Sequence, residues 1–303
     1  MRNFMSFGLQ FPNTCLCILR RIHYPPRHMN LRSYILPSIP LALFVVIGVA
    51  CSSKPKTNED VAESTDNLGK TLVMESIEAH GGKEAWYSAG LLQFRWRYHM
   101  SDLGPTAIVD TLQVIDPQGL NVVHEVPGGE TRFGWNSGES WIMPKDASFS
   151  PPPKFWALTP IYFLGIPFVF DDPNARFELL PEVIPFEGNY FSQVKITFTA
   201  EAGDTPDDTY ILLIDPVSKI TRGAIYTVTS PLVAPDGPTD PKLITLDDLK
   251  SVGGVLLARV HRTYSIDDTL VGDQMRFTEV SEVEWLERGS VDLGIPEGAL
   301  VIE

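Results

Sequence analysis

The sequence predicts a mainly β protein of the α+β class, with one large curved antiparallel sheet that forms an open half-barrel. Three observations support this class. Residues 91–100 alternate between apolar and polar side chains, as in a strand with one face in water. About a dozen β-type segments follow each other with connections too short for crossover helices. The segment 151–173 is apolar and proline-rich, which excludes a central strand. A closed barrel or a two-sheet sandwich is the alternative.

Charge divides the chain near residue 50. Residues 1–50 contain five arginines and no acidic residue, whereas the whole chain has 24 basic and 38 acidic residues. The remaining chain therefore carries 19 basic against 38 acidic residues, a net charge of −19. Such a body repels phosphate backbones and anionic headgroups, so we expect no nucleic-acid partner.

Residues 1–50 are expected to be a signal peptide, and Met29 is a plausible true start. An apolar run follows Arg32 and ends in small residues before Cys51. This pattern is typical of a bacterial lipobox, in which Cys51 becomes the lipidated N-terminus, although Gly48 stands where Leu is usual. An N-terminal anchor that stays uncut is the alternative. Because Cys15 and Cys17 fall in the removed part, the mature body would contain no thiol for a disulfide or a metal site.

Residues 51–66 are expected to be the lipidated cysteine and a flexible tether, because Ser52–Asp66 contains no aromatic residue, Leu or Ile. A single β-rich half-barrel domain is expected over residues 67–303. It begins with a helix at Asn67–His80, whose apolar residues recur near a 3.6-residue period. Gly81 and Gly82 can end this helix, and Lys83–Tyr87 should add one turn with Trp86 inward.

The strands are expected in chain order after the helical turn. Before the proline-rich segment they are Leu91–Met100, Thr106–Ile115, Leu120–Val126, Thr131–Asn136 and Ser140–Met143. After it they are Arg176–Leu180, Tyr190–Ala200, Thr209–Ile214, Ile220–Thr229, Leu243–Leu249, Val255–Ile266 and Asp273–Leu286.

The internal apolar segment Pro151–Pro173 holds six aromatic residues and six prolines. It is too short and too broken to span a bilayer, which takes roughly 20 apolar residues. We expect it to be an irregular helical element that covers the concave side of the sheet, with Phe163, Phe168 and Phe170 facing inward.

Two features resemble a group of bacterial envelope lipoproteins. The first is the helix that ends in His80-Gly81-Gly82 and is followed by Trp86 and a long aromatic strand. The second is Tyr162–Phe168 before an acidic turn. This group resembles the outer-membrane lipoprotein carrier and receptor superfamily. The resemblance covers roughly residues 68–302 and implies a half-barrel with an apolar cavity for acyl chains. Because the chain has its own lipobox, it is closer to the anchored receptor type, and the resemblance favours the outer membrane facing the periplasm.

No catalytic motif is found in the sequence. The nucleophile elbow Gly-x-Ser-x-Gly is absent, so an envelope hydrolase is the weakest of three functional hypotheses, and no cofactor is expected. The body's histidines form no metal-binding pair, and we expect ordinary surface histidines at His80, His99, His124 and His261.

The leading hypothesis is a non-catalytic, lipid-anchored protein that binds an acyl chain or another apolar ligand. The second is an anchored scaffold with a filled core and no ligand. Permanent core packing is the competing interpretation of every residue proposed to line the ligand. These residues are Leu92, Phe94, Trp96, Tyr98, Met100, Phe155, Trp156, Tyr162, Phe163, Phe168 and Phe170.

Overall fold

A computed structural model describes residues 58–200, 205, 207–267 and 270–302. Every described residue belongs to one compact unit, which lies within Lys54–Glu303. The expected signal peptide and Cys51 lie outside the described residues. Within the described ranges, no helix is long and apolar enough to cross a membrane.

The first helix is longer than expected. Helix α1 covers Asn58–Ala79, so the second part of the predicted tether, residues 58–66, is helical. The misplaced boundary has a reason in the sequence, since this stretch has acidic residues near its start, where they favour a helix. Asp66 is therefore an internal helical residue, and its carboxylate accepts a hydrogen bond from the backbone N–H of Phe177 in the sheet. Helix α2 follows at Gly82–Ser88 and buries Trp86, as predicted.

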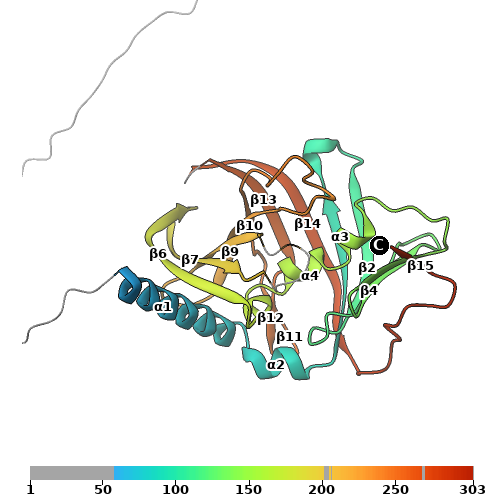
Figure 1. Ribbon diagram of the computed structural model, residues 1–303, viewed down its shortest axis with the longest axis horizontal. Helices are drawn as coiled ribbons and strands as arrows, with labels where there is room; N and C mark the ends of the chain where they lie inside the picture. The colour runs from blue at the N-terminus through green and yellow to red at the C-terminus, as the bar shows by residue number, and fades with distance from the viewer. Residues whose placement is uncertain (1–57, 201–204, 206, 268–269, 303) are drawn as a thin grey trace, which may run out of the picture. The chain divides into compact units, whose positions relative to one another are not determined.

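One open antiparallel sheet of 13 strands forms the body, with the order β15-β5-β4-β3-β2-β1-β14-β13-β10-β9-β8-β7-β6 (Figure 1). The predicted fold class is confirmed. From β1 to β8 the strands are Leu91–His99, Ile108–Ile115, Val122–Glu125, Arg132–Asn136, Glu139–Met143, Ala175–Phe186, Asn189–Phe198 and Thr209–Ile214. The others are β9 Thr221–Thr227, β10 Lys242–Thr245, β13 Val260–Asp267, β14 Leu270–Leu286 and β15 Leu300–Ile302. A short 3-10 turn, η1, covers Ser101–Leu103 between β1 and β2.

The strands differ from the prediction at several places. The expected strand Val255–Ile266 is divided into β12 (Val255–Leu257) and β13 at Ala258-Arg259. Strand β12 pairs with β11 (Lys250–Val252) in a separate two-stranded hairpin, so what looks like one strand in the sequence contains a change of pairing partner. Strand β15 was not predicted, because three residues after a polar loop are too few to show a period.

The internal apolar segment is broken into short helical pieces, as expected. These are α3 (Pro153–Trp156), α4 (Thr159–Leu164) and the 3-10 turn η2 (Phe168–Phe170). Figure 1 shows α3 and α4 inside the curve of the sheet, between the β6–β9 half and the β2–β4 half. We call Pro153–Phe170 the plug.

The largest apolar cluster joins both halves of the sheet to the plug. It runs from Ile142 on β5 to Phe177 on β6 and includes Val73 and Ile77 of α1. We call the sheet face that points into this cluster the concave face. Two smaller clusters lie on the opposite face. One is capped by the C-terminal residues Val291, Leu293 and Ile295. The other is centred on Leu213 and Leu243.

Candidate functional site

The predicted ligand-lining residues of the first strand share the concave face. Leu92, Phe94 and Trp96 are 0%, 0% and 2% exposed, whereas Tyr98 is only partly buried. All four belong to the largest apolar cluster or pack against it, and so does Met100, just after the strand. The alternation places these side chains on one face and the arginines of β1 on the other.

The plug covers this face with aromatic side chains. Trp156, Phe168 and Phe170 are buried, and Phe155, Tyr162 and Phe163 are partly buried. Phe168 stacks on Trp86 of α2 with ring centroids 4.7 Å apart. The other ring contacts reach both halves of the sheet: Phe163–Tyr226 at 4.9 Å, Phe170–Tyr210 at 5.1 Å and Tyr98–Trp156 at 5.5 Å.

Two polar contacts attach the plug to the rest of the fold. His124 Nε2 donates a hydrogen bond to the carbonyl oxygen of Ala157 at 2.8 Å. Just after the plug, Asp171 forms an ion pair with Lys83 of α2. The carbonyl oxygen of Ala157 and the carboxylate of Asp171 both lie close to the short helices of the plug. These two contacts therefore help to hold in place a segment that has little regular secondary structure.

A polar rim borders the concave face near Tyr98. Arg276 donates a hydrogen bond to the Tyr98 hydroxyl at 2.7 Å, and its other nitrogens contact both carboxylate oxygens of Asp102 at 3.2 and 3.0 Å. Burial raises the pKa of Tyr98, and it raises the pKa of Tyr210 more strongly. Both hydroxyls, Tyr98 at this rim and Tyr210 on β8, are therefore neutral hydrogen-bonding groups near pH 7.

The prediction of ordinary surface histidines is wrong for three of the four. His80, His124 and His261 are 0%, 0% and 1% exposed. Burial lowers the pKa of each to about 4, so each ring is neutral near pH 7. His261 stands among polar residues in its strand, which suggests a wet face, but its side chain lies on the concave face together with Thr263.

Hydrogen bonds define the tautomers of these rings. His80 Nδ1 donates to the carbonyl oxygen of Leu256, and His80 Nε2 accepts from the backbone N–H of Thr221. His80 therefore links the end of α1 to the β11–β12 hairpin and to β9. His261 Nδ1 donates to the carbonyl oxygen of Thr245 at 3.1 Å, which leaves Nε2 as an acceptor.

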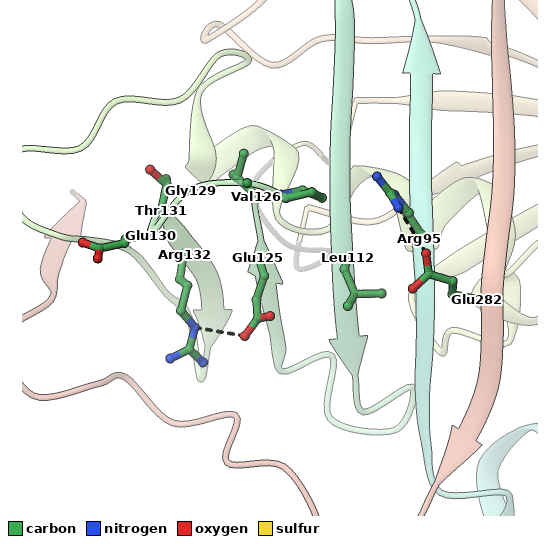
Figure 2. Close-up of a pocket in the computed structure, with 11 residues that line it drawn as sticks. Arg95, Leu112, Glu125, Val126, Gly129, Glu130, Thr131, Arg132 and Glu282 are labelled. Atoms are coloured by element: carbon green, nitrogen blue, oxygen red, sulfur yellow. Dashed lines mark hydrogen bonds and ion pairs between the residues drawn. The ribbon is translucent and has the colours of Figure 1, made fainter.

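Two surface hollows lie away from the concave cluster. The first, about 370 Å³, is bounded by the polar-face residues Arg95 and Glu282 and by the loop between β3 and β4 (Figure 2). Figure 2 shows the Arg95–Glu282 and Arg132–Glu125 ion pairs at its two sides. The second, about 440 Å³, lies between Leu91, Asp116 and the C-terminal segment 288–293. The predicted ligand-lining residues border neither hollow.

Metal coordination is another chemistry that histidines and carboxylates can supply. Over the part of the chain that the structure describes, no group of three or more His, Cys, Asp or Glu side chains is placed to hold a metal ion.

No family model matches the sequence, and no curated protein matches it either. Similar solved structures include a LolA superfamily protein from Nitrosomonas europaea, at 8% identity and a TM-score of 0.44, covering 72% of this chain and 94% of that one. A putative outer membrane lipoprotein-sorting protein domain from Vibrio parahaemolyticus is 11% identical with a TM-score of 0.42, covering 75% and 95%. A DUF1329 family protein from Desulfovibrio piger is 8% identical with a TM-score of 0.44, covering 73% and 93%.

The first two of these descriptions correspond to the superfamily that the sequence resembles. At this level of similarity, the likeness gives no information on what this protein binds.

Proposed function

We propose that this protein binds an acyl chain or another apolar ligand between the concave face and the plug, without catalysis. The observation that carries the proposal is the construction of the plug. A curved sheet face with Leu92, Phe94 and Trp96 at its centre is covered by one-turn helices, not by a regular helix or a second sheet. A cover of short helices, unlike an added strand, is not part of the sheet's backbone hydrogen-bond ladder, so it can open locally.

Ligand entry would replace plug contacts with ligand contacts. The apolar surface that a bound chain buries would offset apolar contact that the plug loses. The Lys83–Asp171 pair and the His124–Ala157 hydrogen bond lie at the two ends of the segment that would move. A ligand bound in this way would correspond to the acyl chain that the superfamily resemblance of the sequence implies.

A specific observation favours the second candidate, an anchored scaffold without ligand. The buried plug residues Trp156, Phe168 and Phe170 are 3%, 1% and 0% exposed, so the concave face is already filled. The two surface hollows lie elsewhere. In this case the plug would be permanent core, and the protein would act through its outer surface.

The test compares the lipid content and the stability of the full chain and two variants, all purified in the same detergent. Phe168→Glu places a carboxylate against Trp86. Val217→Glu is the control, because Val217 is 89% exposed. If the proposal is right, mass spectrometry of the organic extract finds lipid in the wild type and in the control, and much less in Phe168→Glu. If the wild type carries no lipid and Phe168→Glu is unfolded in thermal melting, the scaffold is the better candidate.

We further propose that the body is anchored in the bacterial envelope through lipidated Cys51, in the outer membrane facing the periplasm. Two or more acyl chains on one cysteine give stable attachment. Cys51→Ala should accumulate as an unprocessed precursor in membrane fractions. Normal cleavage and release of that variant would contradict the anchor.

A further inference from the structure

Buried polar atoms without a hydrogen-bond partner gather on the concave face beneath the plug. Among the described residues, Trp96 Nε1, His261 Nε2, Trp156 Nε1 and both ends of the Gln113 side-chain amide are such atoms, and Ser140 Oγ at the β5 end of the same face is another. Trp96, His261, Trp156 and Gln113 are 2%, 1%, 3% and 1% exposed. A buried polar group without a partner destabilises the fold, so the four side chains gathered around β1 call for an explanation.

Strand pairing and ring contacts arrange these groups around Trp96, with Gln113 on β2 to one side of it and His261 on β13 to the other. The Trp96 and His261 rings have centroids 5.1 Å apart. Gln113 on β2 pairs with Phe94 on β1, so its side chain points to the same face as those of Phe94 and Trp96. It is the diagonal neighbour of Trp96 on that face. Trp156 belongs to the plug, and its ring centroid lies 5.5 Å from that of Tyr98. Tyr98 is two residues after Trp96 in β1. We call these four side chains the polar row.

The polar row offers both donors and acceptors, and none of its members is charged. The two indole N–H groups and the amide nitrogen of Gln113 donate. The Gln113 oxygen accepts, and so does His261 Nε2, because His261 Nδ1 is occupied as a donor to Thr245. A group that satisfies such a row must itself donate and accept, which a hydroxyl or a secondary amide does. An ionised carboxylate lacks the donor, and Arg276 at the rim beside Tyr98 is already paired with Asp102.

We propose that the ligand is a neutral amphiphile, an apolar chain that ends in a hydroxyl or a secondary amide, with this polar end bound to the polar row. This inference rests on the proposed function and specifies its ligand class. Because Trp156 belongs to the plug and Trp96, Gln113 and His261 belong to the sheet, the polar end bridges the two and holds the plug over the bound chain.

The experiment is a competition among dodecan-1-ol, dodecane and dodecanoate for the full chain in one detergent at pH 8, with adducts counted by native mass spectrometry. The wild type should retain dodecanol about tenfold more than dodecane, and dodecanoate least. Losing one hydrogen bond costs about a factor of five to ten, so Trp96→Phe and Gln113→Leu should each reduce the preference by about that factor.

Trp141→Phe is the matched control. Trp141 is also fully buried with an unpartnered Nε1, but it belongs to the apolar cluster on the opposite face of the sheet. It should leave the preference for dodecanol unchanged. Thermal melting of each variant checks that the fold is retained, and Gln113→Leu serves where Trp96→Phe is not folded.

The outcomes separate this inference from the proposed function. Equal retention of dodecanol and dodecane, or a preference for dodecanoate, overturns the role of the polar row and leaves apolar binding intact. Retention of none of the three probes overturns both. A preference for dodecanol that Trp141→Phe removes as effectively as Trp96→Phe also overturns the polar row.

Discussion

Trp96 and Arg97 are neighbours in β1 with side chains on opposite faces. Trp96 is 2% exposed in the main apolar cluster, whereas 46% of the Arg97 side chain is exposed. Trp96→Ala should therefore lower the free energy of unfolding by about 3–5 kcal/mol. Arg97→Ala should lower it by less than about 1 kcal/mol, because exposed ion pairs contribute little. Urea titration of both variants measures the difference.

Trp96→Phe sharpens this comparison. It keeps an aromatic ring in the cluster and removes an indole N–H that has no partner among the described residues. It should cost less than about 1.5 kcal/mol, well below the cost of Trp96→Ala. Equal, small losses for Trp96→Ala and Arg97→Ala would mean that the face assignment of β1 is wrong.

The buried histidines predict how stability depends on pH. His80, His124 and His261 have a pKa of about 4 in the folded protein against 6.5 for a free histidine. The unfolded chain therefore binds protons first as the pH falls. Stability should be complete above pH 6.5 and should decline between pH 6.5 and pH 4, by about 3 kcal/mol for each histidine. Urea unfolding at a series of pH values measures this slope.

His261→Phe tests the attribution. It removes one of the three titrating rings, so the stability of the variant should depend less steeply on pH over the same window, by about one proton. A slope that stays the same in His261→Phe would show that this ring is not the source of the proton uptake.

At the scale of elements, Gly81 joins α1 to α2 against the β11–β12 hairpin. Its φ is +120°, and a Cβ there would overlap the carbonyl oxygen of Gly254 in the hairpin turn. Gly104 has nearly the same φ, +122°, but a Cβ at Gly104 would meet no atom of the described residues within 4 Å. Gly104→Ala should cost about 1–3 kcal/mol from backbone strain alone.

Gly81→Ala causes the same backbone strain and must also displace the hairpin, so it should lower the free energy of unfolding by more than about 4 kcal/mol. It should also disturb the backbone hydrogen bond from Leu256 N–H to the His80 carbonyl oxygen, 2.8 Å long. Thermal melting of the two variants checks the difference. If Gly81→Ala and Gly104→Ala had similar melting temperatures, the close contact between Gly81 and the hairpin turn would be contradicted.

At the scale of the whole molecule, local patterns predicted most of the sheet. The period-two alternation in β1 and the turn signals around β8 gave those strands within one residue. The plug was predicted because its prolines exclude a central strand, and Phe163, Phe168 and Phe170 lie inward as expected. In each case, the pattern that predicted the element lies in residues that are close together in the sequence.

What the sequence did not predict depends on contacts between distant segments. Strand β6 is longer than expected because it pairs with β7 across an irregularity between Leu179 and Val183. Phe186 of β6 then reaches Tyr264 of β13 at 5.8 Å, although several strands separate them in the sheet. The burial of His124 and Gln113 likewise follows from the plug that covers them. The periodicity of β2 and β3 does not show that a distant segment covers these strands.

The last prediction concerns cooperativity across the whole sheet. All six tryptophans lie in α2, α3, β1, β4, β5 or β14, and none lies in the β6–β13 half. Tryptophan emission therefore reports one half of the molecule and the plug. Leu212 lies in β8 on the other half, is 0% exposed and belongs to the same apolar cluster as Trp96.

If this cluster makes the sheet one cooperative unit, Leu212→Ala should destabilise both halves together by about 2–5 kcal/mol. Tryptophan emission and far-UV circular dichroism in urea should then shift by the same amount and stay coincident. Val217→Ala, at an exposed turn next to β8, should change neither. A circular dichroism transition that moves while tryptophan emission stays in place would mean that the two halves unfold separately, and that the plug does not couple them.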